Sequence, residues 1–205
     1  MTKTLLLATA LLLTTACSTK NGPQSSTSAL AGDTEELKSL KSALDLYTKA
    51  TINNDVTTLM SFVYPKVFTV VPKEKMTEVL TRAYASGKVP VIKNVKHLKA
   101  EPIEKYDAGM FTFIDSSMTT DLKSPRPDNA KFEAYMLEML SKQLKAKGGT
   151  VTFDKDKHIY TVNHSDRTLA INENDGWKFA GVNQAKKYAE KGLLPQEIVT
   201  KIQSL

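Results

Sequence analysis

The only cysteine of this 205-residue chain, Cys17, directly follows an apolar N-terminal stretch. A single cysteine cannot form an intrachain disulfide, so the fold must be stabilised by burial of apolar side chains. The stretch carries one cation, Lys3, then an apolar run from Leu5 to Leu13 and then small residues, which is the pattern of a secretory signal peptide. This run is far shorter than the roughly 20 residues that a membrane-spanning helix needs, so we expect residues 1–16 to be a signal peptide rather than an anchor helix.

The residues around Cys17 resemble the lipobox of bacterial lipoproteins. They read Thr14-Thr15-Ala16-Cys17-Ser18; Ala16 fits that pattern, whereas Thr14 stands where the family prefers leucine. The resemblance implies cleavage before Cys17, a diacylglyceryl group on its sulfur and an acyl chain such as palmitate on its new amino group. The alternative is ordinary signal-peptidase cleavage that leaves Cys17 as an exposed thiol.

Lipidation of Cys17 would fix where the protein resides, because two or three acyl chains hold a protein on a bilayer effectively permanently. A serine rather than an aspartate at position 18 resembles the signal that sorts lipoproteins to the outer membrane of diderm bacteria. The expected location is therefore the cell envelope, with the lipid bilayer as a partner through acylated Cys17. The small polar residues of 17–33 predict a flexible tether, and residues 34–205 a single domain.

The composition is that of a soluble globular domain, with 41% hydrophobic residues and 28 Lys plus Arg against 22 Asp plus Glu. This positive balance favours an anionic membrane surface, although dispersed lysines more commonly serve solubility. We expect no nucleic-acid partner, because the chain has no run of five basic residues and a secreted protein rarely meets nucleic acid.

Apolar spacing predicts helices in the first part of the folded region. The first begins at a capping signal in Asp33-Thr34 and runs to about Asn53. Asp55 caps a short second helix that Pro65 ends, and a third runs from Pro72 to Gly87.

The apolar period then changes from that of helices to that of strands. Strands are predicted at 89–98 and 109–118, followed by a helix over about 130–146. The residues expected to face inward from that helix are Phe132, Tyr135, Met136, Met139, Leu140 and Leu144. Three more strands are predicted at 150–163, 167–172 and 176–182, with a turn at His164-Ser165-Asp166, a hairpin turn at Asn174-Asp175-Gly176 and a last helix after Leu193.

This element order predicts an α+β fold with helices packed on a curved antiparallel sheet. The order, with Phe62-Val63-Tyr64-Pro65 at a helix end and Asp175-Gly176-Trp177-Lys178-Phe179 in a late strand, resembles the nuclear transport factor 2-like, or SnoaL-like, superfamily. The resemblance implies a cone whose pocket is lined by one face of the sheet. Members include isomerases, dehydratases and binding proteins without catalysis.

Two positions are candidates for a general base. Period-two alternation places Asp115 on the same strand face as Phe111 and Phe113, where an acid in an apolar pocket could abstract a proton; the alternative is that Asp115 begins the polar end of the strand. His158 and Tyr160 share a strand face and could polarise a carbonyl, or His158 is simply exposed.

Phe111, Phe113 and Trp177 are candidates to line a ligand pocket, with the hydrophobic core as the alternative. Metal binding is not expected, because the three histidines and the cysteine lack ligand spacing, and no cofactor motif occurs. Our hypothesis is a membrane-tethered, non-enzymatic module that binds a small apolar ligand or an envelope protein; the alternative is a small isomerase or dehydratase with Asp115 or His158 as base.

Overall fold

The computed structural model describes residues 25–26, 30, 32–87 and 89–205. The predicted signal peptide and Cys17 lie outside the described residues. Within the described part of the chain, no helix is long and apolar enough to cross a bilayer.

The first part of the domain is helical, as its apolar spacing predicts. It contains α2 (Glu35–Asn53), α3 (Val56–Ser61), the short 3-10 helix η1 (Pro65–Thr69) and α4 (Lys73–Ala85). The hydroxyl of Thr34 accepts from the Leu37 amide at the start of α2, and a carboxylate oxygen of Asp55 accepts from the Thr58 amide at the start of α3. These caps satisfy amides that have no partner within the helix, so the predicted helix starts are confirmed.

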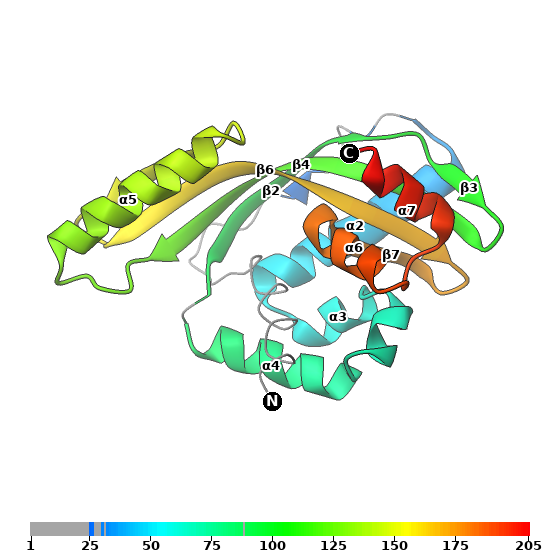
Figure 1. The fold of residues 1–205 in the computed structure, drawn as a ribbon, viewed down its shortest axis with the longest axis horizontal. Helices are drawn as coiled ribbons and strands as arrows, with labels where there is room; N and C mark the ends of the chain where they lie inside the picture. The colour runs from blue at the N-terminus through cyan, green and yellow to red at the C-terminus, as the bar shows by residue number, and fades with distance from the viewer. Residues whose placement is uncertain (1–24, 27–29, 31, 88) are drawn as a thin grey trace.

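The sheet is built around two long strands, β4 (Gly109–Lys123) and β6 (Ile159–Glu173), which pair antiparallel over their whole length. The main order is β1 (Ser25–Ser26), β2 (Val91–Ala100), β4, β6, β5 (Thr150–Asp154). In addition, β3 (Glu104–Tyr106) pairs with β4 and β7 (Gly176–Gly181) pairs with β6. The sheet is strongly curled, and the α+β class with helices packed on a curved antiparallel sheet is confirmed (Figure 1).

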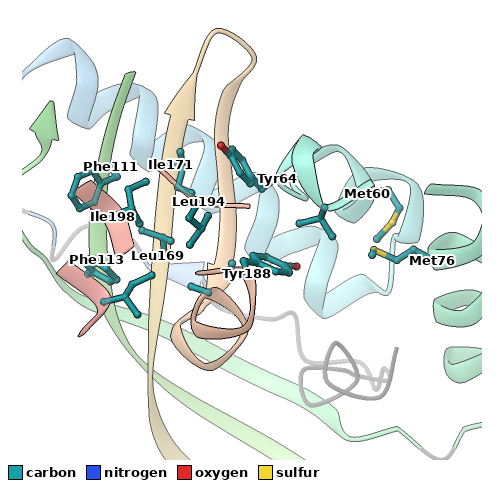
Figure 2. Close-up of a cluster of buried hydrophobic side chains, with 14 of the residues drawn as sticks. Met60, Tyr64, Met76, Phe111, Phe113, Leu169, Ile171, Tyr188, Leu194 and Ile198 are labelled. Atoms are coloured by element: carbon teal, nitrogen blue, oxygen red, sulfur yellow. The ribbon is translucent and has the colours of Figure 1, made fainter. Parts of the chain in front are cut away.

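Helices cover both faces of the sheet near the β6–β7 hairpin. Side chains of β4 and β6 alternate between two separate clusters, so that Phe113 and Leu169 lie on one face and Ile114 and Ala170 on the other. The first face packs against α3, α4, α6 (Val182–Glu190) and α7 (Gln196–Gln203), and the second against α2. Figure 2 shows the first cluster, in which side chains from β4, β6 and the C-terminal segment meet.

The strand prediction for 150–163 is wrong, because this segment is a hairpin. Asp154 accepts hydrogen bonds from the amides of Asp156 and Lys157, and His158 adopts a left-handed backbone with φ 53°. These features turn the chain between β5 and β6. The predicted turn at His164-Ser165-Asp166 is also wrong, since β6 continues through it, paired with β4.

The helix α5 (Ala130–Lys145) lies at one end of the long strands and α7 at the other (Figure 1). The bounds of α5 match the prediction, but the set of α5 side chains predicted to face inward is only partly right. Tyr135 is 61% exposed, and of the α5 residues, all of which the structure describes, Glu133 alone is buried. The helix packs on β5 at the edge of the sheet, where few layers are available to cover its apolar side chains.

The docked part of the chain begins earlier than the predicted boundary at residue 34. The backbone of Ser25–Ser26 pairs in parallel with β2, and Leu30 is buried in the same cluster as Leu37. Both positions fall in the range predicted as a flexible tether. The edge of β2 offers free backbone hydrogen-bonding groups, which accounts for the docking of Ser25–Ser26 there.

Candidate functional site

Asp115 lies beside a cation rather than in an apolar pocket. Its Oδ1 is 3.2 Å from Nε of Arg167, the residue directly opposite it on β6, and 42% of its side-chain surface is exposed. The same guanidinium pairs with Glu101 and lies 5.5 Å over the ring of Phe113. The Asp115 carboxylate is thus one partner in a partly exposed ion-pair network rather than a side chain in an apolar cavity.

Phe111 and Phe113 share a face with Asp115, as the alternation predicts, but they are packed in the core. They are 2% and 1% exposed, with their rings edge to face at 6.2 Å. Leu194 from the segment before α7 and Ile198 from α7 are buried in the same cluster (Figure 2). The face where a cone-shaped fold would hold its pocket is therefore filled by the C-terminal helices.

Trp177 is buried in the cluster on the opposite face, with Phe179. The structure thus does not bring the three predicted pocket residues together. The sheet separates Trp177 from Phe111 and Phe113.

His158 and Tyr160 both contact Glu133 of α5. Nδ1 of His158 lies 2.9 Å from a carboxylate oxygen of Glu133, and the Tyr160 hydroxyl donates to the Glu133 backbone carbonyl at 3.0 Å. Tyr160 is buried and its ring stacks on Phe153 of β5 at 4.5 Å. This cluster holds α5 on the sheet. Sequence reasoning missed Glu133, because a glutamate in a helix is ordinarily exposed.

The two candidate bases are too far apart to serve one substrate. Asp115 pairs with Arg167, whereas His158 precedes Ile159, eight residues before Arg167 on β6, which is roughly 25 Å along an extended strand. Tyr160 also projects from the face of β6 that carries Ala170, opposite to the face of Asp115. They do not form one catalytic site.

Two polar clusters, one buried and one partly buried, had no signal in the sequence. Nε2 of His97 is 3.0 Å from the Thr48 hydroxyl of α2, and its Nδ1 is 2.8 Å from the Ser116 hydroxyl of β4. Burial lowers the pKa of His97 to about 4, with a smaller opposing effect of Asp45, so the imidazole is neutral near neutral pH. It joins α2 to the sheet.

The second cluster lies near the β6–β7 turn. The hydroxyls of Tyr64 and Tyr106 each donate to Oε1 of Glu173 at 2.9 Å, and the Lys66 ammonium is 3.9 Å from the same oxygen. Burial, followed by the hydrogen bond to Glu173, raises the pKa of both tyrosines. The partners are distant in sequence, so local patterns gave no indication of them.

A shallow depression lies beside this second cluster. It is lined by Tyr64, Pro65, Glu173, Asp175, Gly176 and Lys178. Its volume of about 10 Å³ suffices for at most one water molecule. Among the described residues, no three His, Cys, Asp or Glu side chains are placed to hold a metal ion.

Among the helices of the described chain, α5 alone has no buried apolar side chain. Tyr135 is exposed, and the other large apolar side chains of this helix are partly exposed: Phe132, Met136, Leu137, Met139, Leu140 and Leu144. An apolar helix surface of this kind is typical of an interaction site. It is the candidate functional site that the geometry supports best.

Comparison of the chain with models of protein families, with curated proteins and with solved structures gives no match. A function for this chain must therefore be inferred from its own side chains and their contacts.

Proposed function

We propose that this chain is a lipid-anchored protein of the bacterial cell envelope whose α+β domain acts as a non-enzymatic interaction module. The anchor is acylated Cys17 and the compartment the outer membrane of a diderm bacterium. The domain is a divergent member of the nuclear transport factor 2-like superfamily in which the pocket is closed. Its interaction surface is on the outside of the domain.

The absence, among the described residues, of an open pocket beside Asp115 supports a role without catalysis. Buried side chains of α6, α7 and the segment between them occupy the space against Phe111 and Phe113. The candidate bases are also engaged, Asp115 by Arg167 and His158 by Glu133. The residues that an isomerase would need free are thus committed to the structure of the domain.

The intact mass of the full chain, purified from membranes of a diderm bacterium, tests the anchor. We expect residues 17–205 plus a diacylglyceryl group and an amide-linked acyl chain. The matched control is Cys17→Ser, which we expect to lose the acyl mass and to remain unprocessed at this site. Recovery of the processed wild-type chain in the soluble fraction with a free thiol would refute the anchor.

The same preparations test the closed pocket. Native mass spectrometry of the purified chain, measured after the membrane lipid has been removed, should show no bound apolar small molecule. A co-purified ligand at one molecule per chain, lost in Phe113→Ala, would instead favour a binding pocket on this face.

A further inference from the structure

The apolar arc of α5 is wider than the sheet beneath it can cover. Glu133 faces the sheet, where it contacts His158, and Leu137, Leu140 and Leu144 follow it at helical spacing on the same side. Leu144 accordingly lies against Gly149, the residue directly before β5. These residues define the side of the helix that is turned to the sheet.

A second set of apolar side chains lies around the helix from that side. Phe132, Tyr135, Met136 and Met139, here named the α5 flank, recur at spacings of three and four residues and form one stripe. Tyr135 is 61% exposed and the other three are partly exposed. A stripe of aromatic and methionine side chains, next to the side of the helix that packs on the sheet, is typical of a surface that binds an apolar partner.

Basic side chains outnumber acidic ones in and around α5. Residues 126–147 contain five basic side chains, Arg126, Lys131, Lys142, Lys145 and Lys147, against three acidic ones. Glu138 pairs with Lys142 at 2.7 Å, so these two charges offset each other, and Glu133 is buried on the side of the helix turned to the sheet. The guanidinium of Arg126 lies 4.9 Å over the ring of Phe132, so positive charge reaches the apolar stripe itself.

This charge distinguishes between the possible occupants. A second copy of the chain would place two positive surfaces face to face, and lysine is depleted at protein interfaces. An anionic lipid surface would attract the same lysines and accept the apolar stripe at the boundary between headgroups and acyl chains. Tyrosine prefers that boundary because its ring is apolar and its hydroxyl polar.

We propose that the α5 flank binds an anionic phospholipid bilayer, with its apolar side chains at the headgroup boundary and Arg126 and Lys131 on the lipid phosphates. The inference deepens the proposed function, on which it rests for the presence of a membrane beside the domain. The acyl anchor then supplies the attachment, and α5 sets the orientation of the domain on the bilayer.

Quenching of tryptophan fluorescence by brominated phospholipid tests the proposal on the membrane-purified full chain, reconstituted in vesicles. The reporter is Tyr135→Trp, and the matched control is Leu46→Trp at a 56% exposed position of α2. The native Trp177 is buried and provides a constant background. One set of vesicles contains phosphatidylcholine alone, and the other contains about 30 mol% phosphatidylglycerol, enough to give a negative surface potential.

We expect strong quenching of the Tyr135→Trp reporter in the anionic vesicles and little quenching of the Leu46→Trp control. In a reporter chain that also carries Lys131→Gln, the affinity for the anionic vesicles should be lower by about fivefold, because one lysine near the lipid surface is removed. Equal quenching of the reporter and the control would overturn the proposal. So would quenching of the reporter that is the same in both kinds of vesicle.

A second copy as occupant gives a different result. Sedimentation of the chain in detergent would then show a dimer that Tyr135→Ser dissociates, and this outcome would also overturn the proposal. Intact mass reports the acyl anchor independently. If the chain proves not to be acylated, the same reporter and control are compared after addition of the chain to preformed vesicles, so the two proposals fail separately.

Discussion

Nδ1 of His158 lies 2.9 Å from the carboxylate of Glu133, the one buried side chain of α5. This contact joins the turn before β6 to a helix that also packs on the edge strand β5 and accepts a hydrogen bond from Tyr160 of β6. The position of α5 therefore depends on a polar contact as well as on apolar ones.

His158→Ala should loosen α5. The substitution leaves the buried Glu133 carboxylate without its imidazole partner, at an expected cost of about 1–2 kcal/mol in the free energy of unfolding. Hydrogen exchange should accelerate first in the amides of α5. The double variant Glu133→Leu, His158→Ala should recover part of the loss, because no buried carboxylate then remains; strictly additive losses would contradict this account.

His97 predicts an acid-sensitive domain. Its pKa in the folded state is about 4, below the ordinary value of about 6.5 in the unfolded chain. Between these values the unfolded state binds the proton that the folded state excludes, so stability is complete above pH ~6.5 and falls as the pH drops towards ~4. The expected loss is on the order of 2–3 kcal/mol over that interval.

Urea denaturation at several pH values measures this loss. The control His97→Gln cannot take up the proton, so its unfolding free energy should vary less with pH over the same interval. A wild-type chain and a His97→Gln variant with parallel pH profiles would exclude His97 as the source.

Much of the helical part could be predicted, because its signals are local. Asp55 and Pro65 bound α3 and η1 through capping and a missing amide hydrogen, and Asn174-Asp175-Gly176 requires a turn wherever it stands. The continuity of β6 could not be predicted in this way. Its polar residues Ser165 and Asp166 stay extended because Ser117 and Ser116 of β4 pair with them.

The candidate sites were harder to predict, because they depend on contacts between distant segments. Nothing near Phe113 in the sequence indicates that α7, over 80 residues later, returns to cover it. The apolar spacing correctly predicted the helix α5. Which side of this helix faces the sheet depends on the contact with His158 and on the edge strand β5, which lie outside the helix in the sequence. Local patterns thus gave the elements, and tertiary packing decided which side chains remained exposed.

Phe113→Ala distinguishes a core residue from a pocket residue. Phe113 is 1% exposed, so truncation should leave a cavity and lower the unfolding free energy by about 3–5 kcal/mol. The neighbouring Asp115→Asn removes only a half-exposed ion pair and should cost less than about 1 kcal/mol. Thermal and urea unfolding of both variants measure the difference, and a mild effect of Phe113→Ala would favour an open pocket on this face.

Tyr64 and Tyr106 should be energetically coupled through Glu173, since both hydroxyls donate to the same carboxylate oxygen. Tyr64→Phe and Tyr106→Phe should each cost about 1–2 kcal/mol, because each removes a hydrogen bond to a charged acceptor. With one tyrosine absent, the other still donates a hydrogen bond to the carboxylate, so the cost of the double variant should differ from the sum of the single costs.

The raised pKa of both tyrosines also predicts a dependence of stability on alkaline pH. The folded state holds these protons more tightly than the unfolded state, so the wild-type chain should lose stability as the pH rises above ~10. The double variant should lose less. A double-mutant cycle in urea, repeated in alkaline buffer, measures both effects, and additive costs with unchanged alkaline profiles would show that Glu173 does not link the two tyrosines.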